Sequence, residues 1–147
     1  MSETTDQRDR MIRQFYEAVP HARGLGMEIV ELGRARAVME MPYDDKLVGD
    51  PVTGVIHGGA ISALMDTSCS AAVLVHESMP ATTATLDLRI DYMRAATPGQ
   101  RIRAVAECYH VTRSVAFVRA RALDVDSENP VAAATGAFTV GWPEEET

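Results

Sequence analysis

The order of hydrophobic and polar residues along the chain predicts two strands, one long helix and then four more strands. Strand patterns occur at 26–32 and 34–41, and Gly33 supplies a turn between them. Residues 57–76 are mostly apolar over a length that suits a core helix better than a strand. The later strand patterns span 82–93, 101–112, 114–125 and 130–141.

The pattern over residues 82–93 alternates with a period of two. One face would carry Ala84, Leu86, Leu88, Ile90 and Tyr92, and the other Thr83, Thr85, Asp87, Arg89 and Asp91. A strand with one apolar and one polar face packs only one side on a core. We therefore expect Thr85 on the polar face of this strand.

One further segment precedes the first two predicted strands in the sequence, and another follows them. Apolar residues recur at helical spacing near the N-terminus, at Met11, Ile12, Phe15 and Val19. Because Pro20 ends this pattern, we expect a helix over residues 4–18 in an N-terminal segment of residues 1–19. Residues 43–54, YDDKLVGDPVTG, are rich in turn-forming residues and predict a loop. Loops of this length in a compact domain are often functional.

These elements predict one α+β domain over residues 1–147. A chain of 147 residues fits a single domain with a real core. Turn signals at ATPGQ, HVTRS and DSENP separate the last strands as hairpins, which favours an antiparallel sheet. The sheet would wrap one face around the long helix.

The charge balance argues against nucleic-acid and membrane partners. The net charge is -7 and the pI is about 5.0, and such a surface does not attract nucleic acid or anionic lipid. The N-terminal residues are polar and mixed in charge, unlike a signal peptide. Cys69 and Cys108 form no CxxC pair and suggest a reducing compartment. We therefore expect a cytoplasmic protein.

One carboxylate interrupts the predicted long helix. Asp66 is the only acidic residue between Pro51 and His76, and no Lys or Arg accompanies it. Aspartate is a poor residue inside a helix, and burial of an ionised carboxylate without a partner costs several kcal/mol. Two explanations stay open: Asp66 bonds a nearby hydroxyl such as Ser62 or Ser70, or it acts in chemistry.

A His-Gly-Gly sequence precedes this acid at the predicted helix start. Each of Gly58 and Gly59 costs about 0.5–1 kcal/mol of backbone entropy relative to Ala, so a specific reason is expected. One explanation is close packing against a strand. The other is that the free N–H groups of the first helical turn bind an oxygen that becomes negative in a transition state. His57 would then orient the turn or act as a base.

Other kinds of site find little support. The histidines show no HExxH or i, i+4 spacing, so we expect no metal. No GxSxG surrounds Ser62 or Ser68, and no GK[ST] follows the glycines, which argues against a serine triad and a phosphate loop. Cys69 has no basic neighbour and is expected in the core. We expect no cofactor.

The segment G-V-x-H-G-G-x(6)-D, followed by a strand that ends near DYMRAATPG, resembles the hot-dog-fold acyl-CoA thioesterases of the phenylacetate-degradation (PaaI-like) type. The resemblance covers about residues 20–141. It implies a long helix wrapped by a curved antiparallel sheet, and protomers that pair edge to edge as a homodimer or homotetramer with active sites at the dimer interface. It also implies hydrolysis of acyl-CoA thioesters.

The resemblance assigns roles to residues of this chain. Asp66 would be the catalytic carboxylate, as nucleophile or as base toward water, and Gly58 the main oxyanion donor. His57 and Gly59 would shape the turn, and Thr85 would position water or substrate.

Asp50 departs from the family pattern, which commonly has an Asn in this loop. An ionised Asp cannot donate a hydrogen bond, and a second acid near Asp66 could raise one pKa of the pair. The phosphates of CoA need cations, for which Arg94 and Arg113 are candidates, although each is equally explained as an exposed charge.

Two alternative functions stay open on the same fold. One is a non-catalytic acyl-CoA binding or sensing module, which Asp50 in place of the amide favours mildly. The other is an enoyl-CoA hydratase, although the chain lacks the Asp and His five residues apart that such enzymes show. Tight binding without turnover would identify the first, and a hydration assay the second.

Overall fold

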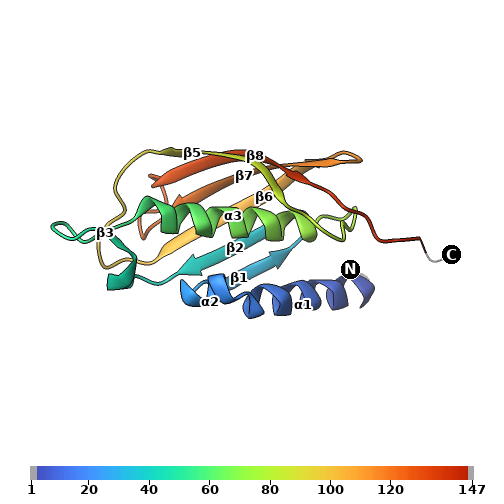
Figure 1. Cartoon of the computed structure of the whole chain (residues 1–147), viewed down its shortest axis with the longest axis horizontal. Helices are drawn as coiled ribbons and strands as arrows, with labels where there is room; N and C mark the ends of the chain where they lie inside the picture. The colour runs from blue at the N-terminus through green and yellow to red at the C-terminus, as the bar shows by residue number, and fades with distance from the viewer. Residues whose placement is uncertain (1–2, 146–147) are drawn as a thin grey trace.

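The computed structural model describes residues 3–145, and its main feature is a curved antiparallel sheet of six strands (Figure 1). The strands are β1 (Glu28–Gly33), β2 (Arg36–Met41), β5 (Thr85–Tyr92), β6 (Ile102–Val111), β7 (Val115–Leu123) and β8 (Ala132–Thr139). They lie in the order β1-β2-β6-β7-β8-β5, so β1 and β5 are the two edges. The predicted strands are all present, with ends that shift by a few residues. The α+β fold that the sequence predicts is confirmed.

Helix α3 (Gly58–Leu74) lies along the concave face of the sheet, mainly over β2, β6 and β7 (Figure 1). Its buried side includes Leu64, Met65 and Cys69, which are fully buried in the core cluster. The strand residues beneath it are largely alanines, namely Ala104, Ala106, Ala116, Ala120, Ala122, Ala132 and Ala134. Small side chains there let a helix approach a sheet closely, so α3 is held firmly along its inner side.

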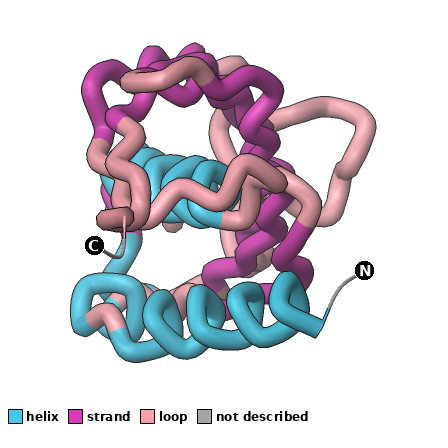
Figure 2. Tube along the Cα trace, turned by 90° about the vertical axis from the view of Figure 1, so that its right-hand side faces the viewer, coloured by secondary structure: helices cyan, strands magenta, loops and turns pink. Residues whose placement is uncertain are grey.

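The N-terminal segment forms two helices, α1 (Glu3–Ala18) and α2 (Pro20–Gly24). Helix α1 lies alongside the core and runs antiparallel to α3, and Tyr16 is its buried residue (Figures 1 and 2). The predicted helix 4–18 is confirmed, whereas α2 was not predicted. None of the helices within residues 3–145 is long and apolar enough to cross a bilayer.

The predicted loop 43–54 contains more structure than expected. A 3₁₀ turn, η1 (Asp45–Leu47), leads into β3 (Val48–Asp50), which pairs with β4 (Val55–Ile56) just before α3. The hydrogen bond from the His57 N–H to the Leu47 carbonyl, at 2.8 Å, ties this small sheet to the start of the helix.

A β-bulge in β5 changes the faces that the sequence predicts. The register against β8 shifts between Thr85 and Asp87, so Thr85 turns toward α3 while Leu86 is 59% exposed. Gly136 on β8 makes room, because a Cβ at this position would lie 2.3 Å from the Asp87 carbonyl oxygen. Thr85 therefore does not share one face with Asp87 and Arg89 as the alternation predicts, and its hydroxyl reaches Asp66. Bulges commonly re-aim a side chain in this way.

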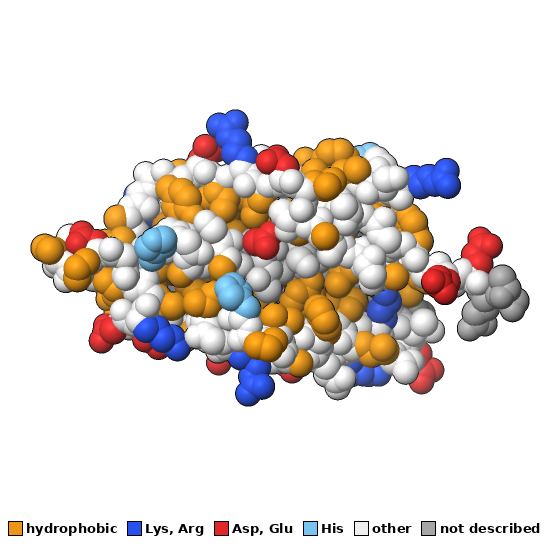
Figure 3. Space-filling view, in the orientation of Figure 1, with side chains coloured by type: hydrophobic (Ala, Val, Ile, Leu, Met, Phe, Trp, Pro, Cys, Tyr) orange, Lys and Arg blue, Asp and Glu red, His pale blue; other side chains and the backbone are white. Residues whose placement is uncertain are grey.

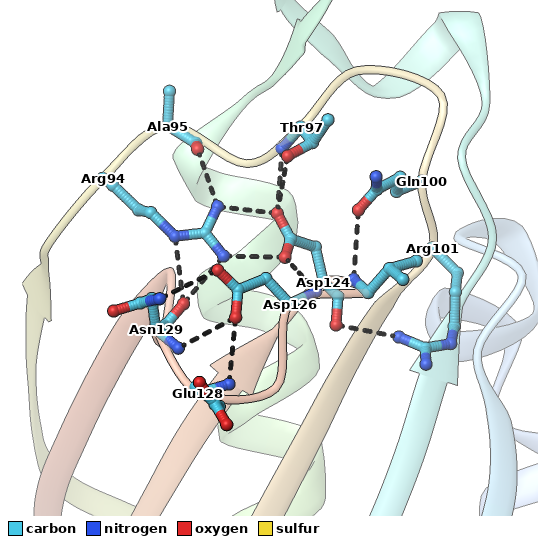
Figure 4. Close-up of polar contacts among 10 residues, drawn as sticks. Arg94, Ala95, Thr97, Gln100, Arg101, Asp124, Asp126, Glu128 and Asn129 are labelled. Atoms are coloured by element: carbon cyan, nitrogen blue, oxygen red, sulfur yellow. Dashed lines mark hydrogen bonds and ion pairs between the residues drawn. The ribbon is translucent and has the colours of Figure 1, made fainter.

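A polar cluster around Asp124 joins the segment after β5 to the loop between β7 and β8 (Figure 4). Asp124 is 1% exposed, and both its oxygens accept from the Arg94 guanidinium at 2.7 Å. The N–H and hydroxyl of Thr97 and the N–H of Asp126 donate to the same carboxylate. The Arg94 hydrogen bond, with those from Thr97 and Asp126, holds the pKa of Asp124 well below its usual range.

Replacement of Asp124 by Asn should destabilise the fold in a pH-dependent manner. Without the carboxylate, Arg94 keeps its charge in a partly buried place, and we expect a loss of about 3 kcal/mol in the free energy of unfolding at pH 7. Because the pKa of Asp124 is depressed in the folded state, its contribution is complete above the unfolded value of about 4 and is lost as pH falls through the folded value. Urea unfolding at pH 7 and at pH 2–3 measures this difference.

Asp45→Asn, at an exposed position, is the matched control and should change stability little. An Asp124→Asn variant as stable as the wild type at pH 7, or one whose deficit is unchanged at the lower pH, would contradict the assignment.

Candidate active site

Asp66 lies on the side of α3 that faces away from the sheet, and it is half-buried. Its Oδ1 accepts a hydrogen bond from the Thr85 hydroxyl at 2.6 Å, the contact that the bulge in β5 allows. Within residues 3–145, no hydrogen bond uses Oδ2. The acid in the apolar helix is thus held by one hydroxyl and keeps one oxygen available for chemistry.

The helix start is shaped by His57, which is the N-cap of α3. Its Nδ1 accepts from the Gly59 N–H at 2.8 Å, and a Cβ on Gly59 would lie 2.9 Å from that nitrogen. A Cβ on Gly49 of β3 would lie 2.7 Å from the His57 Cα. His57 and Gly59 therefore form a tight turn, and the structure uses the His57 side chain to cap the helix.

Gly58 offers the free N–H of this turn. Among the described residues, no acceptor takes a hydrogen bond from this N–H, as is usual in the first turn of a helix. The ring of Tyr92 lies over the glycine, and a Cβ on Gly58 would meet it at 3.4 Å, an ordinary van der Waals distance. The Tyr92 hydroxyl donates to the Gly58 carbonyl at 2.7 Å and also contacts the Ser62 hydroxyl.

Sequence analysis did not single out Tyr92 as a site residue. Its position as the last residue of an apolar strand face suggested core packing, and only the contact with Gly58 reveals the other role. Close packing does not require a glycine at position 58, because a Cβ would make only ordinary contacts, whereas the free N–H explanation fits this geometry.

One chain does not bring Gly58 and Asp66 together. They are eight residues apart in one helix, which corresponds to a rise of about 12 Å along its axis. A carbonyl carbon under attack and its own oxygen are separated by only about 1.2 Å. The acid and the N–H of the same chain therefore lie too far apart to act on one carbonyl group.

Asp50 is exposed and turned into its own loop. Its oxygens accept from the Val52 N–H at 3.0 Å and from the Thr53 hydroxyl at 2.8 Å. The Thr53 hydroxyl, followed by the backbone N–H groups of Val52 and Thr53, lowers the pKa of the Asp50 carboxyl. Asp50 thus holds the turn before β4 as an ionised carboxylate.

The two candidate arginines lie at opposite ends of the sheet. Arg94 follows the end of β5. Arg113 lies in the turn between β6 and β7, where the start of β7 pairs with the end of β8, which in turn pairs with the start of β5. All five N–H groups of Arg94 are used, by Asp124, Ala95 and Asn129, so none remains for a phosphate (Figure 4). The Arg113 side chain is exposed, and only its carbonyl is engaged, by the Trp142 indole N–H at 2.7 Å.

The N–H at the start of α3 and the carboxylate at its middle suit chemistry at a carbonyl. A carboxylate oxygen can attack or take a proton from water, and a free backbone N–H can stabilise the resulting oxyanion. Among residues 3–145, no three His, Cys, Asp or Glu side chains converge in a way that could hold a metal ion.

Comparisons with known proteins agree with this geometry. Residues 53–131, more than half of the chain, match the model of the thioesterase superfamily. The medium/long-chain acyl-CoA thioesterase YigI of Escherichia coli is 26% identical over 152 residues, which cover 94% of this chain and 97% of that protein.

Solved structures show the same fold. A protein of Pseudomonas aeruginosa is 37% identical with a TM-score of 0.78, over 89% of this chain and 97% of that one. A mutant of the phenylacetic acid degradation protein PaaI of Thermus thermophilus is 26% identical with a TM-score of 0.72, over 82% and 97%. The extent of the family match and the hot-dog arrangement of sheet and helix together establish that the chain belongs to the thioesterase superfamily.

Proposed function

We propose that this protein hydrolyses acyl-CoA thioesters, with the Asp66 carboxylate as the reacting group and the Gly58 N–H as the oxyanion donor. Family membership and the activity named for YigI support the reaction class and the substrate class. The single observation that carries the residue assignment is the state of Asp66: the Thr85 hydroxyl fixes one oxygen and the other is unbonded.

The chemistry requires few groups. Either Oδ2 of Asp66 attacks the thioester carbonyl carbon to give an anhydride that water then cleaves, or it takes a proton from a water that attacks directly. In both routes the carbonyl oxygen becomes negative and accepts from the Gly58 N–H. Collapse breaks the C–S bond, and the CoA sulfur leaves as thiolate and takes a proton, so the products are the free acid and CoA.

A homodimer would bring the two halves of the site together. Strand β5 is an edge of the sheet, and within residues 3–145 no strand pairs with its outer backbone groups. Thr85, at its start, contacts Asp66, and Tyr92, at its end, contacts Gly58. Antiparallel pairing of β5 with its copy around a two-fold axis places the start of one strand beside the end of the other.

This pairing sets Asp66 of one protomer near Gly58 of the partner subunit, and it builds two equivalent sites. Leu86, Tyr92 and Met93 are 59%, 49% and 58% exposed on or beside this edge, and a long edge strand with exposed apolar residues favours association. We propose the homodimer as the active unit, alone or doubled to a tetramer.

Two further parts of the proposal concern the residue that binds a CoA phosphate and the cellular compartment of the protein. Arg113 is the arginine that we retain for a CoA phosphate, because the guanidinium of Arg94 is already saturated. We also propose that the protein acts in the cytoplasm. The two cysteines, Cys69 and Cys108, are free and buried, which fits a reducing compartment.

Replacement of Asp66 by Asn should abolish most of the activity. The amide neither attacks nor takes a proton, and we expect turnover to fall by about 10²–10⁴-fold with little change in stability. Release of free CoA thiol from a panel of acyl-CoAs measures the rate. Asp45→Asn removes an exposed carboxylate as the control. If the Asp66 variant keeps the wild-type rate, its role is refuted; if the wild type cleaves no acyl-CoA, the proposed reaction is refuted.

Replacement of Thr85 by Val should test the hydrogen bond that orients Asp66. The side chain keeps its shape and loses the hydroxyl, and we expect kcat to fall by about 10- to 100-fold. Thr85→Ser restores the donor and should recover the rate to within about threefold of wild type. Equal rates for the Val and Ser variants would show that the hydroxyl has no part in the reaction.

A further inference from the structure

A hollow of about 560 Å³ lies between α1 and the segment 80–83, with the second half of α3 beside it. Hydrophobic side chains gather between α1 and α3 on the face of the molecule that Figure 3 shows. The apolar residues that line the hollow are Met11, Ile12, Phe15, Leu74, Pro80 and Ala81. Phe15 is 60% exposed and Met11 64% exposed, so this apolar surface is uncovered in the single chain.

Two hydrogen bonds hold the walls of the hollow in place. The Tyr16 hydroxyl bonds the Ser70 hydroxyl, which joins α1 to α3, and the Arg8 guanidinium donates to the Pro80 carbonyl, which joins α1 to the opposite wall. Burial raises the pKa of Tyr16 to about 12, so its hydroxyl stays neutral. Arg8 is the one charged residue that lines the hollow, and it already has an acceptor.

Two residues that line the hollow are close in sequence to residues of the proposed active site. Ser70, which lines it, follows Asp66 by one turn of the same helix and therefore lies on the same face. Thr83, which lines the other wall, is two residues before Thr85, the partner of Asp66. A ligand whose reacting carbon lies at Asp66 can thus extend directly along α3 into the hollow.

We propose that this hollow binds the acyl group of the substrate, and that the acyl group is an unbranched apolar chain of about ten carbons. The inference rests on the proposed hydrolysis at Asp66. From Asp66 to Leu74 is eight residues, a distance of about 12 Å along the helix. An extended chain advances about 1.2 Å per bond, since three backbone bonds span about 3.5 Å, so about ten bonds reach Leu74.

The mostly apolar side chains that line the hollow favour apolar acyl groups over polar ones. An apolar chain gains by leaving water, and each buried methylene raises affinity by about fourfold. A charged or strongly polar acyl group would lose its hydration against this mostly apolar lining, in which Arg8 is the single charged residue. The N-terminal helix is therefore a determinant of chain-length specificity, through Phe15 and Met11.

The test compares kcat/KM for saturated acyl-CoAs from two to sixteen carbons. We expect a rise by about two- to fourfold per methylene up to about ten carbons and a plateau beyond it. Phe15→Ala should lower the ratio of decanoyl-CoA to butanoyl-CoA hydrolysis by about tenfold. Ala81→Phe, which fills the hollow, should shift the plateau to shorter chains. Val125→Ala, an exposed apolar residue outside the hollow, is the matched control.

Binding provides a readout that does not need turnover. Calorimetric titration of the Asp66→Asn variant should show tighter binding of decanoyl-CoA than of butanoyl-CoA, and Phe15→Ala in that background should remove most of the difference. If acyl-CoAs are cleaved or bound but neither variant changes the chain-length dependence, the hollow is not the acyl site, although the proposed reaction stands. The inference also fails if Phe15→Ala changes only the mass of the assembly measured by light scattering, and not the chain-length dependence. That result would show that the hollow binds a second copy of the chain. If no acyl-CoA is cleaved but binding still depends on chain length, the proposed reaction is refuted and the hollow remains an acyl-binding site.

Discussion

The separation of Gly58 and Asp66 along one rigid helix governs how this molecule can work. A helix fixes its own dimensions, so about 12 Å of rise separates the two groups in every copy of the chain. Chemistry at one carbonyl needs both groups within contact distance, and we propose that a second copy of the chain meets this requirement. The unpaired edge of β5, with the Asp66 contact at one end and the Gly58 contact at the other, supplies the means. Under this proposal, catalysis requires that two copies of the chain associate.

Much of the fold follows from local sequence patterns. Helix α3 and the strands were predicted because their apolar residues keep a regular period over many positions, and His57 to Gly59 were recognised from the cost of adjacent glycines at a helix start. The small sheet of β3 and β4 was missed, since two- and three-residue strands carry no period. Helix α2 was missed for the same reason. The family resemblance supplied the hot-dog fold and the reaction class, which the comparisons confirm.

The details of the site depend on contacts between distant residues, and no local pattern contains them. Alternation predicts that Thr85 shares one face with Asp87 and Arg89, whereas the bulge between Thr85 and Asp87, beside which Gly136 closely approaches the Asp87 carbonyl, turns Thr85 toward Asp66. Gly136 lies far along the chain from Thr85, so the sequence gives no sign that the two belong together. Arg94 illustrates the same limit. Its charge suggested that it binds a phosphate, whereas in the structure its guanidinium pairs with the carboxylate of Asp124, thirty residues later, and stabilises the fold. The acyl hollow also depends on placement, because α1 forms a wall only after it folds back along α3.

Subunit complementation tests the shared site most directly. Gly58→Pro removes the N–H at a position where a helix accepts proline, and His57 already has the extended backbone that precedes proline. Homodimers of Gly58→Pro and of Asp66→Asn should each be nearly inactive. Dimers re-formed from an equal mixture should regain about a quarter of the wild-type rate, because half of them are mixed and each mixed dimer has one intact site. If mixing restores no activity while mass analysis shows that mixed dimers form, the site lies within one chain and the account is wrong.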